Sequence, residues 1–101
     1  MDALVKRVTS RIAEAIHPDK IILFGSRAIG AATGESDIDL VLVYSGPKSK
    51  REVRLAVHRL FDHPDFSLDL FVFSPDELER QKKYANTIAR EISERGVVCY
   101  G

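Results

Sequence analysis

The sequence contains one cysteine, Cys99, no tryptophan, and no excess of charge of either sign. A single thiol excludes an internal disulfide and any metal site built from several thiolates, which fits a protein of the reducing cytoplasm. The 15 Lys and Arg residues balance the 15 Asp and Glu residues. Proteins that coat long nucleic acids usually carry a strong positive excess. We therefore expect no long nucleic acid as a partner.

Long apolar runs are also absent. The apolar stretches at residues 21–24 and 40–44 are far shorter than the roughly 20 residues that span a bilayer. Residues 1–16 place charges in every turn, unlike a signal peptide. These features predict a cytoplasmic protein with no membrane partner. The length of 101 residues and the hydrophobic fraction of 45% predict one folded domain over residues 1–101.

Helical and extended patterns alternate along the chain. Apolar residues at helical spacing predict a helix over residues 3–16. The capping box Ser49-x-x-Glu52 predicts the start of a second helix. Ser74 followed by Pro75 predicts the start of a third helix, which we expect to run to about residue 95. Short runs rich in β-forming residues predict strands at residues 21–24, 37–44, 67–73 and 97–100.

The connections between these strands predict their directions. A crossover with a helix joins strand 37–44 to strand 67–73, so this pair should be parallel. A short excursion joins strand 21–24 to strand 37–44, so this pair should be antiparallel. The result is a small mixed β-sheet, and we expect the helices to pack on one of its faces. The fold class is α+β, bordering on α/β.

Two carboxylates stand at the start of strand 37–44. Asp37 and Asp39 share one face of the strand, with Cα atoms about 6.5 Å apart. Convergent carboxylates repel each other unless a cation lies between them, and a hard divalent ion such as Mg²⁺ accepts such oxygen ligands. An isolated Asp-x-Asp is more often a solvent-facing strand entrance, since short motifs recur by chance. A third acid is needed to favour the metal site.

Asp69, early in strand 67–73, is that third acid. If the two strands are parallel, their starts lie at the same end of the sheet, and Asp69 joins Asp37 and Asp39 there. A carboxylate on such an apolar sheet needs a compensating partner. The partner is either a metal ion or, as the simpler interpretation, an arginine such as Arg27 or Arg54.

Gly25, Ser26 and Arg27 follow strand 21–24 and offer groups that bind phosphate. Glycine lets a ligand approach the backbone, free N–H groups at a helix start favour an anion, and Ser26 and Arg27 add polar contacts. Alone, Gly-Ser is more often a simple N-cap turn. Next to the acids, it suggests a phosphate cradle beside a divalent metal, as phosphoryl or nucleotidyl transfer requires.

The combination of Phe24-Gly25-Ser26-Arg27 with Asp37-Ile38-Asp39-Leu40 resembles the signature of the DNA polymerase β-like nucleotidyltransferase superfamily, especially its minimal nucleotidyltransferase branch. The resemblance implies that fold. It also implies that Gly25, Ser26 and Arg27 bind the triphosphate, and that Asp37, Asp39 and Asp69 are the catalytic carboxylates and metal ligands. The implied cofactor is Mg²⁺ or Mn²⁺, with ATP or another nucleoside triphosphate as substrate.

The same resemblance suggests what the transfer is for. Members of this branch usually partner a helical HEPN-domain protein, often a ribonuclease toxin, and act as its antitoxin by adenylylating it. We therefore expect transfer of AMP to a partner hydroxyl. The alternative is a binding module that neutralises the HEPN protein by masking it. Ile29, where many relatives carry a second arginine, favours the alternative, and the three carboxylates favour the enzyme.

Overall fold

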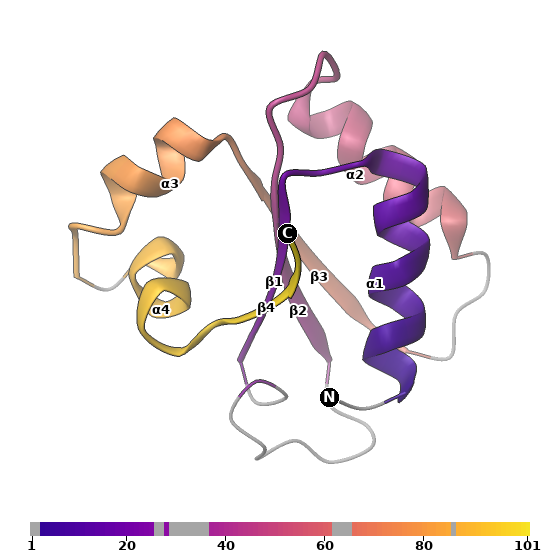
Figure 1. The fold of residues 1–101 in the computed structure, drawn as a ribbon, viewed down its shortest axis with the longest axis horizontal. Coiled ribbons are helices and arrows are strands. Elements are labelled where there is room, and N and C mark those ends of the chain that lie inside the picture. Colours follow the sequence, from indigo (N-terminus) through magenta and orange to yellow (C-terminus); the bar gives the residue numbers. More distant parts are fainter. Residues whose placement is uncertain (1–2, 26–27, 29–36, 62–65, 86) are drawn as a thin grey trace.

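The computed structural model describes residues 3–25, 28, 37–61, 66–85 and 87–101. Helices and strands alternate within these residues in a pattern close to the predicted one (Figure 1). In chain order they are α1 (Ala3–Ile16), β1 (Lys20–Phe24), β2 (Ile38–Val43), α2 (Lys50–Leu60), β3 (Leu68–Phe73), α3 (Pro75–Gln81), α4 (Ile88–Arg95) and β4 (Val97–Tyr100). None of the described helices is long and apolar enough to cross a membrane.

The strands form one mixed sheet in the order β3-β2-β1-β4. β2 and β3 are parallel, whereas β1 runs antiparallel to both β2 and β4. The predicted strand directions are therefore confirmed. β2 and β3 pair without a register shift from Ile38 with Leu68 to Val43 with Phe73. This pairing places the start of β2 beside the start of β3.

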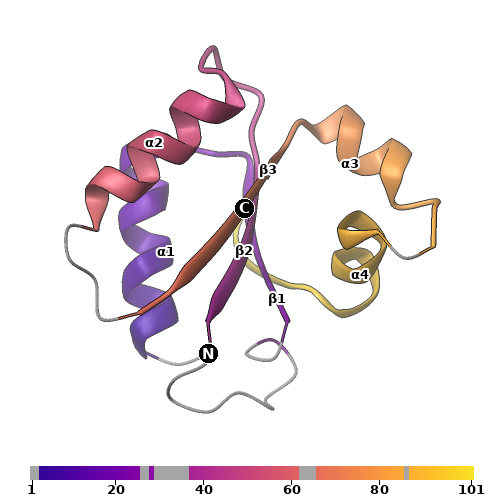
Figure 2. The same cartoon turned by 180° about the vertical axis from the view of Figure 1, so that it is seen from behind.

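Helices cover both faces of the sheet, not one face as the sequence suggested. α1 and α2 pack on one face, and α3 and α4 lie on the other, with the sheet seen nearly edge-on between them (Figures 1 and 2). The physical reason is visible in β1, where Ile21 through Phe24 are all buried. A strand that is apolar on both sides must be covered on both sides. The predicted mixed sheet is confirmed, but the predicted position of its helices is wrong.

The expected helix over residues 74–95 is two helices. α3 begins at the predicted point, with Ser74 as N-cap in a complete capping box with Glu77, but it ends at Gln81. α4 starts after Thr87, whose hydroxyl accepts a hydrogen bond from the Arg90 amide at 3.1 Å. The same hydroxyl donates toward the Tyr84 carbonyl at 2.9 Å. Thr87 therefore stabilises a break that the helical periodicity conceals.

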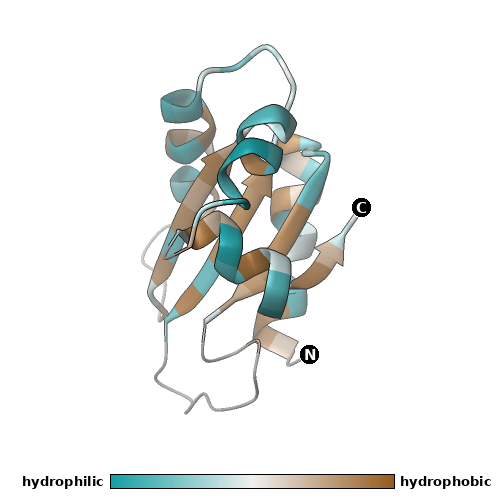
Figure 3. Ribbon diagram, turned by 90° about the vertical axis from the view of Figure 1, so that its left-hand side faces the viewer, coloured by the Kyte–Doolittle hydropathy of each residue, from teal (hydrophilic) through white to brown (hydrophobic). Residues whose placement is uncertain are grey.

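The larger core lies between the sheet and the helices α1 and α2. Its fully buried side chains include Val5, Val8 and Ile12 of α1 and Leu40 and Leu42 of β2. A second, smaller cluster lies on the other face, where Ile92 of α4 packs with Ile22, Phe24, Val41 and Val43. Figure 3 shows that the strands consist mostly of apolar residues, whereas the helices carry many hydrophilic ones. The two clusters fix the sheet between its helical layers.

Candidate active site

The candidate site lies at the end of the sheet where β1 finishes and β2 and β3 begin. In this region Asp39 of β2 pairs in register with Asp69 of β3 and, on its other side, with Phe24 of β1. Alternation along the strands places both acids on the face of Val41 and Phe71, the face that α3 and α4 cover. The expected convergence of Asp39 and Asp69 at one sheet end is confirmed.

The two carboxyl groups interact directly. Partial burial, a hydrogen bond between the side chains of Asp39 and Asp69, and repulsion from Asp69, Asp37 and Glu91 together raise the pKa of Asp39 to about 6. Burial is the largest of these causes. Neighbouring carboxylates repel each other when both are ionised. The pair therefore concentrates negative charge that a proton or a cation must compensate.

Asp37 takes a more peripheral place. It is exposed and immediately precedes β2, and it acts on Asp39 through space. Within the described residues, no three histidine, cysteine or acidic side chains are close enough together to hold one metal ion. The structure thus brings Asp39 and Asp69 into contact with Asp37 nearby. The role of all three as metal ligands stays a prediction.

The simpler interpretation of Asp69 was an ion pair with an arginine. Arg54 is exposed on α2, which packs on the opposite face of the sheet. Among the described residues, no ion pair involves Asp69. Arg27, the other proposed arginine, lies outside the described residues, as does Ser26. For Arg54, therefore, the ion-pair interpretation is wrong.

Gly25 is positioned by a close approach to Asp39. Its φ of +75° lies in the left-handed region that favours glycine. A Cβ atom at this position would collide with the Asp39 carboxylate. The Gly25 carbonyl accepts a hydrogen bond from the Ala28 amide at 3.1 Å, which closes a turn directly after β1. Glycine is needed here because the turn must pass the carboxylate at the head of β2.

Glu91 is a residue that the sequence did not identify. It lies on α4 next to Ile92, which packs against the sheet, and its charge contributes to the raised pKa of Asp39. Its position beside the buried residues of a predicted helix was readable from the sequence. The break before α4, which determines where Glu91 lies, was not.

The donor chemistry of the pair fits a hard divalent cation. Asp39 and Asp69 provide carboxylate oxygens from neighbouring strands, which is the ligand type that Mg²⁺ and Mn²⁺ prefer. Because two carboxylates lie together in a partly buried position, a bound cation would compensate their negative charge. The turn at Gly25 brings backbone close to the Asp39 carboxylate, at a position where a side chain would collide with it. The arrangement can hold a cation next to an anionic ligand.

Comparison with known proteins identifies the family. The profile of a family described as "Nucleotidyltransferase domain" matches residues 4–99, nearly the whole chain. The chain belongs to this family. Its fold is that of the polymerase β-like nucleotidyltransferases, as the motif at Gly25 and Asp37 suggested. No curated protein sequence matches the chain significantly.

Two solved structures have a similar fold. One is a protein from Sulfolobus solfataricus, provisionally described as a nucleotidyltransferase, with 24% identity and a TM-score of 0.60. The similarity covers 94% of this chain and 75% of that protein. The other is a toxin-antitoxin with AMP-PNP, with 19% identity and a TM-score of 0.59 over 95% of this chain and 73% of the matched chain. At these identities the likeness shows the shared fold.

Proposed function

We propose that this nucleotidyltransferase domain transfers AMP from ATP to a hydroxyl group of a partner protein, and that the partner is a HEPN-domain toxin. The observation that carries the proposal is the contact between Asp39 and Asp69 beside the Gly25 turn. This contact places acidic oxygens from two strands next to the backbone of the Gly25 turn at one sheet end. Membership of the nucleotidyltransferase family supplies the reaction class.

The transfer is a single displacement at phosphorus. The oxygen of the partner hydroxyl forms a bond to the α-phosphorus of ATP, and the bond from that phosphorus to the bridging oxygen of the β-phosphate breaks. Pyrophosphate leaves with the bonding electrons, and the hydroxyl proton passes to a carboxylate, for which Asp69 is the proposed base. The Gly25 turn, with Ser26 and Arg27, binds the triphosphate in line with the incoming hydroxyl.

A divalent cation has an evident place in this arrangement. Asp39 and Asp69 would hold it, with Asp37 as the third carboxylate. Bound Mg²⁺ or Mn²⁺ supplies compensation for the triphosphate charge and lowers the pKa of an attacking hydroxyl. The chain's own contribution is to fix the carboxylates on neighbouring strands, so that little reorganisation is needed when the ligands arrive.

The nature of the acceptor is supported by comparison. A structure of similar fold is a toxin-antitoxin with AMP-PNP, which favours ATP as the donor and a toxin as the partner. The sequence resemblance to the minimal nucleotidyltransferases favours a HEPN protein in that role. A hydroxyl presented by a folded partner must reach the Asp39–Asp69 pair, which lies at an end of the sheet and not deep between the layers.

Intact-mass analysis of a HEPN partner tests the proposal. The partner is incubated with this protein, ATP and Mg²⁺, and the expected result is a gain of one AMP for each modified hydroxyl. Asp39→Asn should abolish the gain, because it removes one carboxylate of the pair. Asp19→Asn, an exposed aspartate before the opposite end of β1, should leave it intact. No gain with wild-type protein, together with full neutralisation of the partner by Asp39→Asn, would favour the masking module.

A further inference from the structure

A cavity lies against α4, outside the carboxylate pair itself. Its volume is about 380 Å³. The described residues that line it are Thr87, Ile88, Arg90, Glu91, Glu94 and Arg95. The lining is therefore rich in charge, with two arginines and two glutamates on eight residues of helix. Such a surface suits a polar, charged ligand better than an apolar one.

This cavity borders the candidate site. Ile88 and Ile92 of α4 pack in the same cluster as Phe24 of β1 and Val41 of β2, and Phe24 is the strand partner of Asp39. Glu91 lies between these two isoleucines in the sequence, and its negative charge helps to raise the pKa of Asp39. Packing and electrostatics agree that α4 forms a boundary of the carboxylate site.

The end of α4 lies at the same end of the sheet as the Gly25 turn. β4 pairs with β1 through Val97 opposite Leu23. Arg95 precedes Val97 by two residues, and Gly25 follows Leu23 by two residues, so both lie just beyond this pair. The junction between α4 and β4 packs tightly on β1, since a Cβ on Gly96 would collide with Ile22. In Figure 1 the last turn of α4 accordingly descends toward the end of β1.

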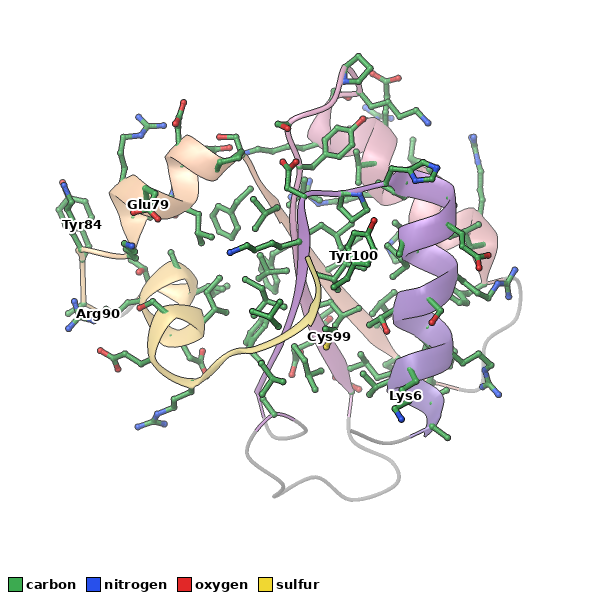
Figure 4. All side chains as sticks on the ribbon, viewed as in Figure 1. Lys6, Glu79, Tyr84, Arg90, Cys99 and Tyr100 are labelled. Carbon is green, nitrogen blue, oxygen red and sulfur yellow. The ribbon has the colours of Figure 1, made fainter. Side chains whose placement is uncertain are left out.

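The charged side chains that line the cavity differ in whether they form hydrogen bonds or ion pairs with other described residues. Arg90 donates to Glu94 at 2.6 Å and to the Lys82 carbonyl at 3.4 Å, and Figure 4 shows it on the outer side of α4. The side chains of Glu91 and Arg95 form no hydrogen bond or ion pair with any described residue. Arg95 is therefore a guanidinium without a partner among the described residues, at the border of a site of excess negative charge.

We propose that Arg95 binds the β- or γ-phosphate of the nucleoside triphosphate, and that the α4 cavity is part of the nucleotide site, on the side opposite β2. This inference rests on the proposed function. Four carboxylates, Asp37, Asp39, Asp69 and Glu91, act in this region and repel a polyanion. A guanidinium offsets that repulsion and matches phosphate oxygens in a two-pronged geometry. The simpler role for Arg95 is to stabilise the last turn of α4 through the helix dipole.

Equilibrium binding of ATP and AMP in the presence of Mg²⁺ separates the two roles. The Kd of each nucleotide is measured by calorimetry for wild type, Arg95→Ala and Arg95→Lys. Arg59→Ala, another exposed basic residue in the last turn of a helix, is the matched control on the opposite face. We expect Arg95→Ala to weaken ATP binding about tenfold or more, as for loss of a charged hydrogen bond. The binding of AMP should weaken much less, and Arg95→Lys should give an intermediate Kd for ATP.

Each other outcome has a distinct meaning. Equal ATP binding by wild type and Arg95→Ala would overturn this inference and leave the proposed function standing. Equal proportional losses for ATP and AMP would assign Arg95 the helix-stabilising role and likewise overturn it. Failure of the wild-type protein to bind ATP with Mg²⁺ would overturn the proposed function itself. Should Arg95→Ala not fold, Arg95→Lys is used instead. A ratio of ATP affinity to AMP affinity below that of wild type would support the inference, and an unchanged ratio would overturn it.

Discussion

Replacement of Asp39 by asparagine is expected to stabilise the protein at neutral pH while it abolishes transfer. The pKa of Asp39 rises from 3.8 to about 6 in the folded chain, and each unit corresponds to about 1.4 kcal/mol between the two protonation states. The ionised carboxylate therefore lowers the free energy of unfolding by at most about 3 kcal/mol. Asp39 remains partly exposed, so solvent screening reduces this effect and we expect a measured gain of about 1–2 kcal/mol.

The pH dependence has a definite sign. Below about pH 4, Asp39 is protonated in both the folded and the unfolded chain. Between pH 4 and 6 the folded chain retains a proton that the unfolded chain releases, so stability falls as the pH rises. The loss is complete about one pH unit above the folded-state pKa, near pH 7. The stability difference between Asp39→Asn and wild type should therefore be small near pH 4, increase through this window and level off above it.

Urea unfolding at fixed pH steps between 4.5 and 8 measures this difference. The buffers contain a chelator, because a bound divalent cation would itself stabilise wild type. Asp19→Asn is the matched control and should follow the wild-type curve. An Asp39→Asn variant no more stable than wild type at pH 7.5, or a stability difference that does not change with pH, would refute the conclusion that the ionised Asp39 carboxylate destabilises the fold.

Three further substitutions test local features. Gly25→Ala places a side chain against Asp39 at a φ of +75°. It should lower the melting temperature, because it adds at least about 1–2 kcal/mol of backbone strain, and it should weaken Mg²⁺-dependent ATP binding. Unchanged ATP binding would contradict the close approach of Gly25 to Asp39. Ser74→Ala removes a complete capping box with Glu77 and should cost about 1 kcal/mol in urea unfolding. Lys50 and Ser74 hold the pKa of Glu77 at about 2. The contribution of ionised Glu77 to stability should therefore be complete above about pH 4.5 and disappear as the pH falls toward 2. His17→Gly relieves a left-handed residue after α1, with φ of 53°, and should raise the melting temperature slightly, by about 0.5–1 kcal/mol of stability.

The parts of the site that were predictable from the sequence depend on connectivity. A helix-containing crossover makes β2 and β3 parallel, and the period of two along each strand then fixes which face Asp39 and Asp69 share. Both conclusions follow from residue order alone. The turn at Gly25 was likewise predictable, because its glycine directly follows an apolar strand. The structure adds that Gly25 makes room for Asp39 itself.

The parts that were not predictable depend on tertiary packing. The periodicity of Leu78, Ala85, Ile88 and Ile92 is compatible with one helix, and only the hydrogen bonds of Thr87 reveal the break. Once the helix is broken, α4 turns back over β1 and covers the second face of the sheet. A single helix of the predicted length has no such freedom. The contribution of Glu91 and the α4 cavity therefore followed from a break that periodicity alone cannot detect.

The two faces of the sheet divide structural and chemical roles. Most fully buried side chains, among them Ile12, Leu40 and Val57, lie on the side of α1 and α2. The face toward α3 and α4 has a smaller buried cluster around Val41 and Ile92, and it is the face that presents the acids. A carboxylate pair that destabilises the fold by about 1–2 kcal/mol is tolerable there, because the larger core on the opposite face supplies most of the burial. Substitutions in that larger core should therefore affect stability far more than they affect ligand binding, and substitutions of the cavity-lining residues of α4 should do the reverse.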